Sequence, residues 1–339
     1  MRTLTSIVER EGSTMQKKLV DLTEHIFTKH QFDRDGKPQI EEKTFGLAPA
    51  EAGLSPQVIN KGVSEYNLGK EEMFKIDTAA THQLYEDPRF TVNVSIDDVG
   101  VKKQKENGRN SDKKQKETRE YVHNTIAHVE KGNKRYILNG SCNEQVLKFL
   151  LAFLLHNGLL DGHNLLFFVD GARSLQAVIL TMFKWLPHVR IILDWYHLKK
   201  KCEYELSLVL KGSKIRNAVL EQLLPILWLG KVDVAINFVR TIDPEKLKID
   251  QSVERLVGYF ERNRDNIPCY ALRRKLGLRN SSNKGEKAND LCVASRQKHN
   301  GMSWSKQGSV ALTTVTTMHI NHELGYWYSQ DKIEFKLAS

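Results

Sequence analysis

Two aspartates that each follow a short apolar run are the first candidates for chemistry in this chain. Asp170 comes directly after residues 165–169, and Asp194 comes directly after residues 189–193. Runs of this length without polar residues are typical of strands buried on both faces. A carboxylate after such a strand is often only a turn or helix-capping residue. Two of them, with His197 three residues after the second, favour a functional site.

The chain between these two aspartates predicts a crossover that would bring them together. Residues 174–185 have apolar side chains at helical spacing, and Pro187 ends the pattern. Two strands joined by a helix run parallel, so their carboxyl ends lie at one edge of the sheet. Open α/β sheets usually place their sites at that edge. We therefore expect Asp170 and Asp194 to lie side by side.

A third carboxylate lies on an earlier strand. In residues 90–100, valine and isoleucine alternate with polar residues, which predicts a strand with one apolar and one polar face. Asp97 falls on the polar face and Asp98 on the apolar face, so Asp97 is the better candidate. A twist or a bulge would exchange the two, and the sequence leaves that choice open.

The remaining patterns place these acids in an α/β protein. Residues 121–130 and 134–138 are rich in β-formers and are separated by a Lys-Gly-Asn turn, so three antiparallel strands precede a helix at 143–155. The predicted fold is a mixed sheet of three antiparallel and two parallel strands, with helices on both faces. Further helices are expected at residues 199–210, 218–229, 232–241, 251–263, 284–296 and 310–323.

These patterns divide the chain into successive regions. Residues 1–88 are an α-helical N-terminal region, with helices at 13–28, 54–66 and 71–84, and form either a shortened DNA-binding module or a helical cap. Residues 102–119 are almost entirely polar, as expected of a solvated connection or of a basic finger that touches phosphates. The α/β core occupies 89–212 and 277–320, an all-α insertion occupies 213–276, and 321–339 form a C-terminal tail.

Composition narrows the class of protein. The 339 residues carry a net charge of +10 and have a pI near 9.2, a balance that is common in nucleic-acid-binding proteins and also in proteins with a generic basic surface. The four cysteines are far apart and form no CxxC, which disfavours a zinc ribbon or a disulfide framework. The first residues lack a signal-peptide core, and no run is long enough to span a bilayer. We expect a cytoplasmic protein without a membrane partner.

The order of the predicted elements is ribonuclease-H-like, with acids on the central strands. Asp97, Asp170 and Glu286, which lies on the predicted helix at 284–296, are suited to hold two Mg²⁺ ions about 4 Å apart. One ion would activate a water or a 3′-hydroxyl group, and the other would stabilise the leaving oxygen. Without a cation, three clustered carboxylates would raise one another's pKa.

Four stretches of sequence support a more specific assignment: VSIDDVGVKKQ at 94–104, FFVDGARSL at 167–175, ILDWYHLKKK at 192–201 and NSSNKGEKANDLCVASRQKHNGMSW at 280–304. The chain resembles bacterial insertion-sequence transposases of the DDE type with a Mutator-like catalytic core. The resemblance extends from residue 90 to about 318, roughly two thirds of the chain. One departure is Asn280-Ser281-Ser282, where relatives often have Gly-Ser-Gly, and it keeps Asp290 and Glu261 as alternatives to Glu286.

The resemblance implies a DNA transposase that cleaves and transfers strands at insertion-sequence ends. It assigns Asp97, Asp170 and Glu286 as catalytic metal ligands for Mg²⁺, with Mn²⁺ as a substitute. Asp194 and His197 match the family's D-x-x-H signature, which adds Asp194 to the metal ligands and His197 to the catalytic residues. The implied partners are double-stranded DNA, as terminal repeats and target, and further copies of the chain. The implied location is the bacterial cytoplasm, at the nucleoid when DNA is bound.

Basic and aromatic residues near these motifs are candidate DNA contacts, although each is also an ordinary surface or core residue. Trp195 and Tyr196 would stack on bases or pack in the core, and Trp228 is expected in the core. The candidate phosphate contacts are Arg173, Lys199, Lys200, Lys201, Arg296 and Lys298. Two other functions remain open: an inactive, truncated transposase that only binds DNA, and a ribonuclease-H-like nuclease that cleaves without strand transfer.

Overall fold

The computed structural model describes residues 2–39, 90–104, 119–186, 189–248, 252–275, 277–299 and 301–337. The helices expected at 54–66 and 71–84, and most of the polar connection at 102–119, lie outside these residues.

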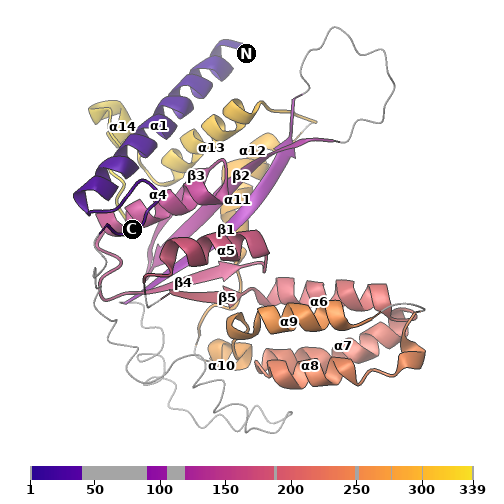
Figure 1. The fold of residues 1–339 in the computed structure, drawn as a ribbon. Coiled ribbons are helices and arrows are strands. Elements are labelled where there is room, and N and C mark those ends of the chain that lie inside the picture. Colours follow the sequence, from indigo (N-terminus) through magenta and orange to yellow (C-terminus); the bar gives the residue numbers. More distant parts are fainter. Residues whose placement is uncertain are drawn as a thin grey trace.

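A five-stranded mixed sheet forms the centre of the fold (Figure 1). Strands β1 (Thr91–Lys102), β2 (Tyr121–Lys131) and β3 (Lys134–Gly140) pair antiparallel. Strand β4 (Asn164–Val169) pairs in parallel with β1, and β5 (Val189–Leu193) in parallel with β4. The strand order is β3-β2-β1-β4-β5. The expected α/β class and the expected three antiparallel and two parallel strands are confirmed.

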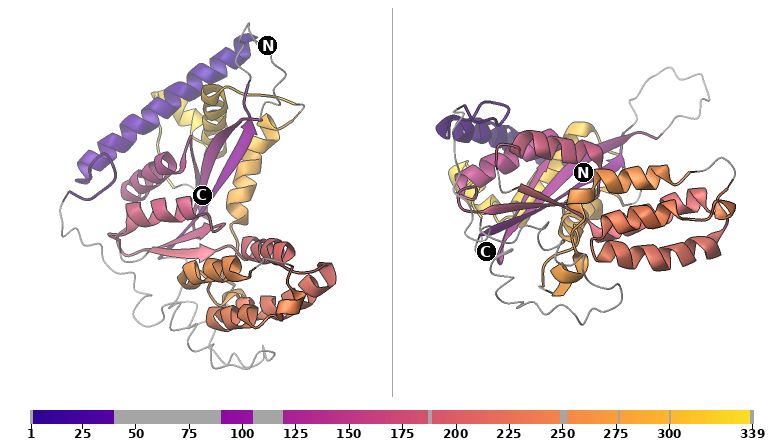
Figure 2. Two further views of the ribbon diagram at one scale, coloured as in Figure 1. Left: turned by 45° about the vertical axis from the view of Figure 1, so that its right-hand side comes forward. Right: turned by 60° about the horizontal axis from the view of Figure 1, so that its bottom comes forward.

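One face of the sheet is covered by three helices (Figure 2). Helix α4 (Asn143–His156) connects β3 to β4, α5 (Arg173–Phe183) connects β4 to β5, and α1 (Arg2–Lys29) packs against α4. Alternate β1 side chains, Val92, Val94 and Ile96, are buried under these helices in the largest apolar cluster. Each such side chain stabilises the fold by about 1.5–3 kcal/mol when fully buried.

The opposite face is covered by segments from the C-terminal third of the chain. Helix α11 (Asn283–Asn289), a π-helical turn η5 (Asp290–Ala294) and α12 (Ser295–Gln297) follow one another without a break. Val99, Val101 and Ile126 pack against Ala288 and Cys292 on this side. The single helix predicted at 284–296 therefore contains one widened turn, and helices cover both faces as expected.

A helical bundle lies beside β5, at one end of the sheet (Figure 1). It has its own apolar core, to which Leu198, Leu223, Val239 and Phe260 belong. Its first helix begins earlier than the predicted residue 199, because Asp194 caps it by accepting the backbone N–H of His197. The bundle consists of α6 (Trp195–Val209), α7 (Ser213–Trp228), α8 (Val232–Arg240), η3 (Pro244–Lys246), α9 (Glu254–Arg262) and η4 (Arg264–Asn266), and α10 (Tyr270–Lys275) follows it.

Segments near both ends of the chain pack against the core around the sheet. Helix α1 starts well before the predicted residue 13 and packs against α13 (Lys306–Ile320). The expected tail at 321–339 contains helix α14 (Leu324–Gln330). Trp327 and Phe335 from this segment are buried in the cluster that covers the sheet, and Glu323 accepts a hydrogen bond from the hydroxyl of Tyr136 at 2.9 Å. Apolar side chains in the last residues therefore stabilise the sheet.

The contact between α1 and α13 depends on a glycine. A Cβ atom at Gly12 would clash with the carbonyl oxygen of Ala311, whereas one at Gly325 in α14 would meet nothing within 4 Å. We expect Gly12→Ala to lower the free energy of unfolding by about 1–3 kcal/mol through overpacking. Gly325→Ala should leave it unchanged or raise it by up to about 1 kcal/mol through helix propensity. Denaturant midpoints of the two variants test this, and equal midpoints would contradict the close approach of the helices.

Candidate active site

The two parallel strands β4 and β5 end side by side, and each is followed by an aspartate. Val169 pairs with Leu193, and the backbone N–H of Asp194 donates to the carbonyl of Val169 at 2.8 Å. Asp170 and Asp194 therefore lie at the same edge of the sheet, as the crossover predicted. Asp170 is exposed, and its Oδ1 accepts the backbone N–H of Ala172 at 2.9 Å.

Asp97 reaches this region from the middle of β1. It shares a face of the sheet with Ser95, and that face packs against α11. Its Oδ2 accepts a hydrogen bond from the side-chain amide of Asn289 at 2.6 Å, and its Oδ1 accepts the backbone N–H of Asp98 at 3.0 Å. Asp98 points to the other face, where the hydroxyl of Thr125 donates to it. The geometry thus agrees with the preference for Asp97 over Asp98.

Glu286 is brought toward Asp97 by the close packing of α11 on β1. A Cβ atom at Gly285 would lie 3.1 Å from the Cβ of Ser95, so the glycine allows the helix to approach the strand. The alternatives to Glu286 lie elsewhere. Asp290 is exposed on the π-helical turn, and Glu261 pairs with Arg240 in the bundle at 3.3 Å.

The charges of the three acids act on one another and on the neighbouring side chains of His197 and Lys200. The pKa of Asp97 is raised above its ordinary value, first by burial and further by the charges of Asp170 and Glu286. Hydrogen bonds from Asn289 and from the backbone of Asp98 act in the opposite direction. Within the part of the chain that the structure describes, none of the three carboxylates forms an ion pair. This edge of the sheet therefore has the charge of a cation-binding site.

The three carboxylates do not enclose a single ion as their side chains lie. Among the residues that are placed, no group of three or more His, Cys, Asp or Glu side chains is close enough to hold a metal. The charges of Asp170 and Glu286 nevertheless reach Asp97. The three acids fit a divalent cation by their chemistry, and coordination of one ion by all of them requires that their side chains move closer together.

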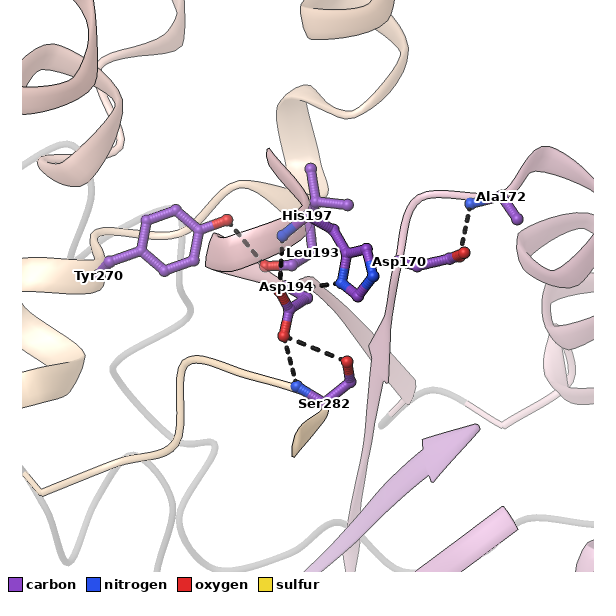
Figure 3. A network of polar contacts seen from close by, with 7 residues as sticks. All are labelled: Asp170, Ala172, Leu193, Asp194, His197, Tyr270 and Ser282. Atoms are coloured by element: carbon purple, nitrogen blue, oxygen red, sulfur yellow. Dashed lines mark hydrogen bonds and ion pairs between the residues drawn. The ribbon is translucent and has the colours of Figure 1, made fainter. Parts of the chain in front are cut away.

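Asp194 is the centre of a buried hydrogen-bond network (Figure 3). Its Oδ1 accepts the backbone N–H of His197 at 2.8 Å and bonds to the ring Nδ1 of His197 at 3.1 Å. Its Oδ2 accepts the backbone N–H of Ser282 at 2.6 Å and the Ser282 hydroxyl at 3.1 Å. The hydroxyl of Tyr270 donates to the carbonyl of Leu193 at 2.8 Å, one residue earlier.

The expectation that Asp194 ligates a metal stays a prediction, and in this network its carboxylate has protein groups as partners. An ionised carboxylate has about four acceptor positions, and the four hydrogen bonds occupy them. The side chain of Asp194 is 1% exposed. Burial alone would raise the pKa of Asp194, but the hydrogen bonds from His197 and Ser282 outweigh it and lower that pKa. Asp194 is therefore held as a buried anion that connects β5 and α6 to the segment before α11.

His197 is positioned by Asp194 and lies toward the other acids. Figure 3 shows its ring between the side chain of Asp194 and the end of β4 that carries Asp170. The hydrogen bond to Asp194 raises the pKa of His197, burial lowers it, and the charges of Asp194, Asp170 and Glu286 raise it further. Because Nδ1 bonds to Asp194, the imidazole is oriented with Nε2 away from that carboxylate.

The expected phosphate-binding residues lie in different surroundings. Lys201 pairs with the buried Glu205 at 2.9 Å, which gives it a structural partner. Lys199 lies 3.9 Å from Glu203, and Lys200 lies over the ring of Tyr196 at 4.3 Å from its centroid. Arg173 is exposed at the start of α5, next to the Asp170 turn.

Arg296 and Lys298, the other two expected phosphate contacts, lie in a different part of the chain from these four residues. They are exposed on and just after α12, where Gln297 accepts a hydrogen bond from the ring nitrogen of Trp304 through its carbonyl oxygen. Trp304 in turn pairs with Lys103 at the end of β1. The two cations therefore lie beside the end of the β1–β2 hairpin.

The aromatic residues separate into core and surface. The rings of Trp195 and Trp228 are 4.8 Å apart and both contact Tyr270, which confirms the core interpretation for Trp228 and extends it to Trp195. Tyr196 is 51% exposed beside His197. Of the aromatic residues in the D-x-x-H segment, Tyr196 is the one available for stacking on a base.

Sequence reasoning missed Asn289 and Ser282, which hold the acids in place. Asn289 lies three residues after Glu286 on the same helix, so helical spacing contained a signal for it. Ser282 directly precedes α11 and has the residue type of a helix cap, but its partner is Asp194 rather than the helix. No local pattern predicts that pairing.

The raised pKa of His197 depends on Asp194 more than on Asp170. We expect Asp194→Asn to lower the pKa of His197 to about or below its ordinary value of 6.5, and Asp170→Asn to lower it less. In the wild type, the protonated imidazole of His197 stabilises the fold below pH 6.5. This stabilisation is lost as the pH rises through the raised pKa of His197. NMR titration of the labelled imidazole measures both shifts. An unchanged pKa in Asp194→Asn would contradict the assigned hydrogen bond.

Comparisons with known proteins leave the geometry as the basis for assigning a function. No protein-family model, no curated protein and no solved structure matches this chain. Across the residues that the structure places, no helix combines the length and the apolar character needed to cross a membrane.

Proposed function

We propose that this protein is a metal-dependent DNA transposase of the DDE type, which cleaves and transfers DNA strands at insertion-sequence ends. One observation carries the proposal: Asp97 on β1, Asp170 after β4 and Glu286 on α11 lie near enough to one another at one edge of the sheet for the charges of Asp170 and Glu286 to act on Asp97. The strand order β3-β2-β1-β4-β5, with the first three strands antiparallel, supports a ribonuclease-H-like core.

The divalent cations belong with the three acids and not with Asp194. Asp97, Asp170 and Glu286 would hold Mg²⁺ or Mn²⁺ through carboxylate oxygens, the ligands that these ions prefer. When bound, the metals would activate a water or a 3′-hydroxyl group and stabilise the leaving oxygen. The repulsion that raises the pKa of Asp97 would then be relieved by the bound charge.

His197 and the nearby cations would bind the DNA strand. A raised pKa makes the imidazolium of His197 more available near neutral pH, where Nε2–H would donate to a phosphate oxygen. Arg173 and Lys200 are exposed on the helices that begin after β4 and β5. The net charge of +10 favours association with a polyanion such as DNA.

Strand cleavage is the direct test of the acids. We expect Asp170→Ala to reduce metal-dependent cleavage of a terminal-repeat duplex to background while DNA binding is largely kept. The matched control is Asp98→Ala, because this acid is adjacent to Asp97 but lies on the opposite face of the sheet. Cleavage that survives Asp170→Ala would refute the assignment. Joined products from the wild type distinguish a transposase from a nuclease that only cuts.

Metal binding gives a second test that needs no DNA. Because the pKa of Asp97 is raised, its ionised form costs stability at neutral pH, so Asp97→Asn should leave the metal-free protein as stable or more stable. Mn²⁺ should raise the unfolding temperature of the wild type and of Asp98→Asn, but not that of Asp97→Asn combined with Glu286→Gln. A wild type that shows no affinity for Mg²⁺ or Mn²⁺ up to millimolar concentration would favour a DNA-binding protein without catalysis.

A further inference from the structure

Helix α11 carries Glu286 on the flank that faces the other acids. A cavity of about 340 Å³ lies on its opposite flank, between the helix and the β2–β3 hairpin. The residues that line it include His128, Glu130, Arg135, Lys284 and Lys287. Residues in a helix are rotated by about 100° per position, so Lys284 and Glu286 project from α11 about 200° apart. The cavity is thus separated from the acidic edge by the width of the helix.

His128, one of the residues that line this cavity, is a buried polar side chain with an unsatisfied ring nitrogen. It pairs across the sheet with Ser95 and Ile137, on the face that α11 covers, and is 5% exposed. Its Nδ1 has no hydrogen-bond partner, and the nearest carboxylate oxygen, on Glu130, is 4.0 Å away. A buried nitrogen without a partner costs free energy, which a ligand that supplies the missing bond would recover.

Three cations surround His128 without carboxylate partners. Arg135 from β3 and Lys284 and Lys287 from α11 are exposed, and in the described part of the chain none of them forms an ion pair. Glu130, the acid at the cavity, is already paired with Arg279 at 2.8 Å. The lining therefore carries an excess of positive charge around a buried hydrogen-bonding group.

We propose that this cavity is a binding site for a phosphate group, held by Arg135, Lys284 and Lys287, with His128 donating from Nδ1 at its base. The source of the phosphate is either the backbone of a bound DNA strand or free inorganic phosphate. The phosphate site itself does not depend on catalysis. Only the assignment to a DNA strand rests on the proposed function.

The electrostatics of the cavity predict that phosphate binding is coupled to protonation of His128. Burial lowers the pKa of His128 to about 4, the charges of Arg279, Lys284 and Arg135 lower it as well, and Glu130 opposes them. Lys287 also lines the cavity and adds positive charge. A bound anion would offset these cations and raise the pKa of His128. Phosphate affinity should therefore increase as the pH falls from about 6 toward 4.

The first experiment uses inorganic phosphate and the full chain. We expect phosphate to shift the labelled His128 resonances and to raise the pKa of His128, with saturation at one site by calorimetry. The paired substitution Arg135→Gln with Lys284→Gln should weaken binding at least tenfold. Lys214→Gln with Lys306→Gln, which removes two exposed lysines from α7 and the start of α13, is the matched control and should bind normally.

The second experiment identifies the source of the phosphate. If a DNA strand occupies the cavity, the Arg135/Lys284 variant should release fewer counterions on binding. The slope of log K for duplex binding against log salt concentration should then be smaller in magnitude by about one to two than in the lysine control. If DNA binding is equal in both variants while phosphate binding is lost only in the first, the site serves the free anion.

The outcomes separate this proposal from the catalytic one. Absence of phosphate binding by the wild type, or equal phosphate binding by the Arg135/Lys284 variant and its control, would overturn the phosphate site. Neither result affects cleavage that depends on Asp170. Conversely, if the protein does not cleave DNA, the phosphate titration is unaffected. All four substitutions replace exposed side chains, so folding can be verified by their unfolding temperatures.

Discussion

The buried carboxylate of Asp194 holds the parts of the candidate site together. It accepts hydrogen bonds from His197, at the start of the helical bundle, and from Ser282, just before α11. These residues are separated in sequence by the whole bundle, so the carboxylate closes a long loop onto the end of β5. A buried anion with four donors is stable because its acceptor positions are filled, and it would become costly if one donor were lost. The position of Glu286 and the orientation of His197 both depend on this group.

Helix α11 then divides the charge of the molecule between its two flanks. Glu286 lies toward Asp97 and Asp170, whereas Lys284 and Lys287 line the cavity around His128. Gly285 allows the helix to pack closely on β1 between these flanks. Such a separation would direct metal ions to one flank and phosphate to the other, which suits a protein that acts on a polyanion. Burial of Asp97, with the charges of Asp170 and Glu286 nearby, is a stability cost of the kind that functional sites often retain.

Much of the core could be predicted from the sequence because its signals are local. Alternation along β1 placed Asp97 and Asp98 on opposite faces, and the apolar runs before Asp170 and Asp194 predicted adjacent parallel strands. The bounds of elements were less predictable. Helix α6 starts earlier than its apolar pattern because of the cap from Asp194, and the expected tail contains α14 because Trp327 and Phe335 find apolar partners on the core.

The sequence by itself predicted the adjacent parallel strands that end at Asp170 and Asp194, and placed Asp97 and Asp98 on opposite faces of one strand, because these follow from chirality and from backbone periodicity. Only the tertiary structure decided that Asp194 is saturated by Ser282 and that His128 is buried beneath α11 with an unpaired nitrogen. It also decided that Lys201 forms an ion pair with Glu205. The physical reason is that hydrogen bonding and burial depend on which distant residues share one space, and periodicity along the chain contains no information about those partners.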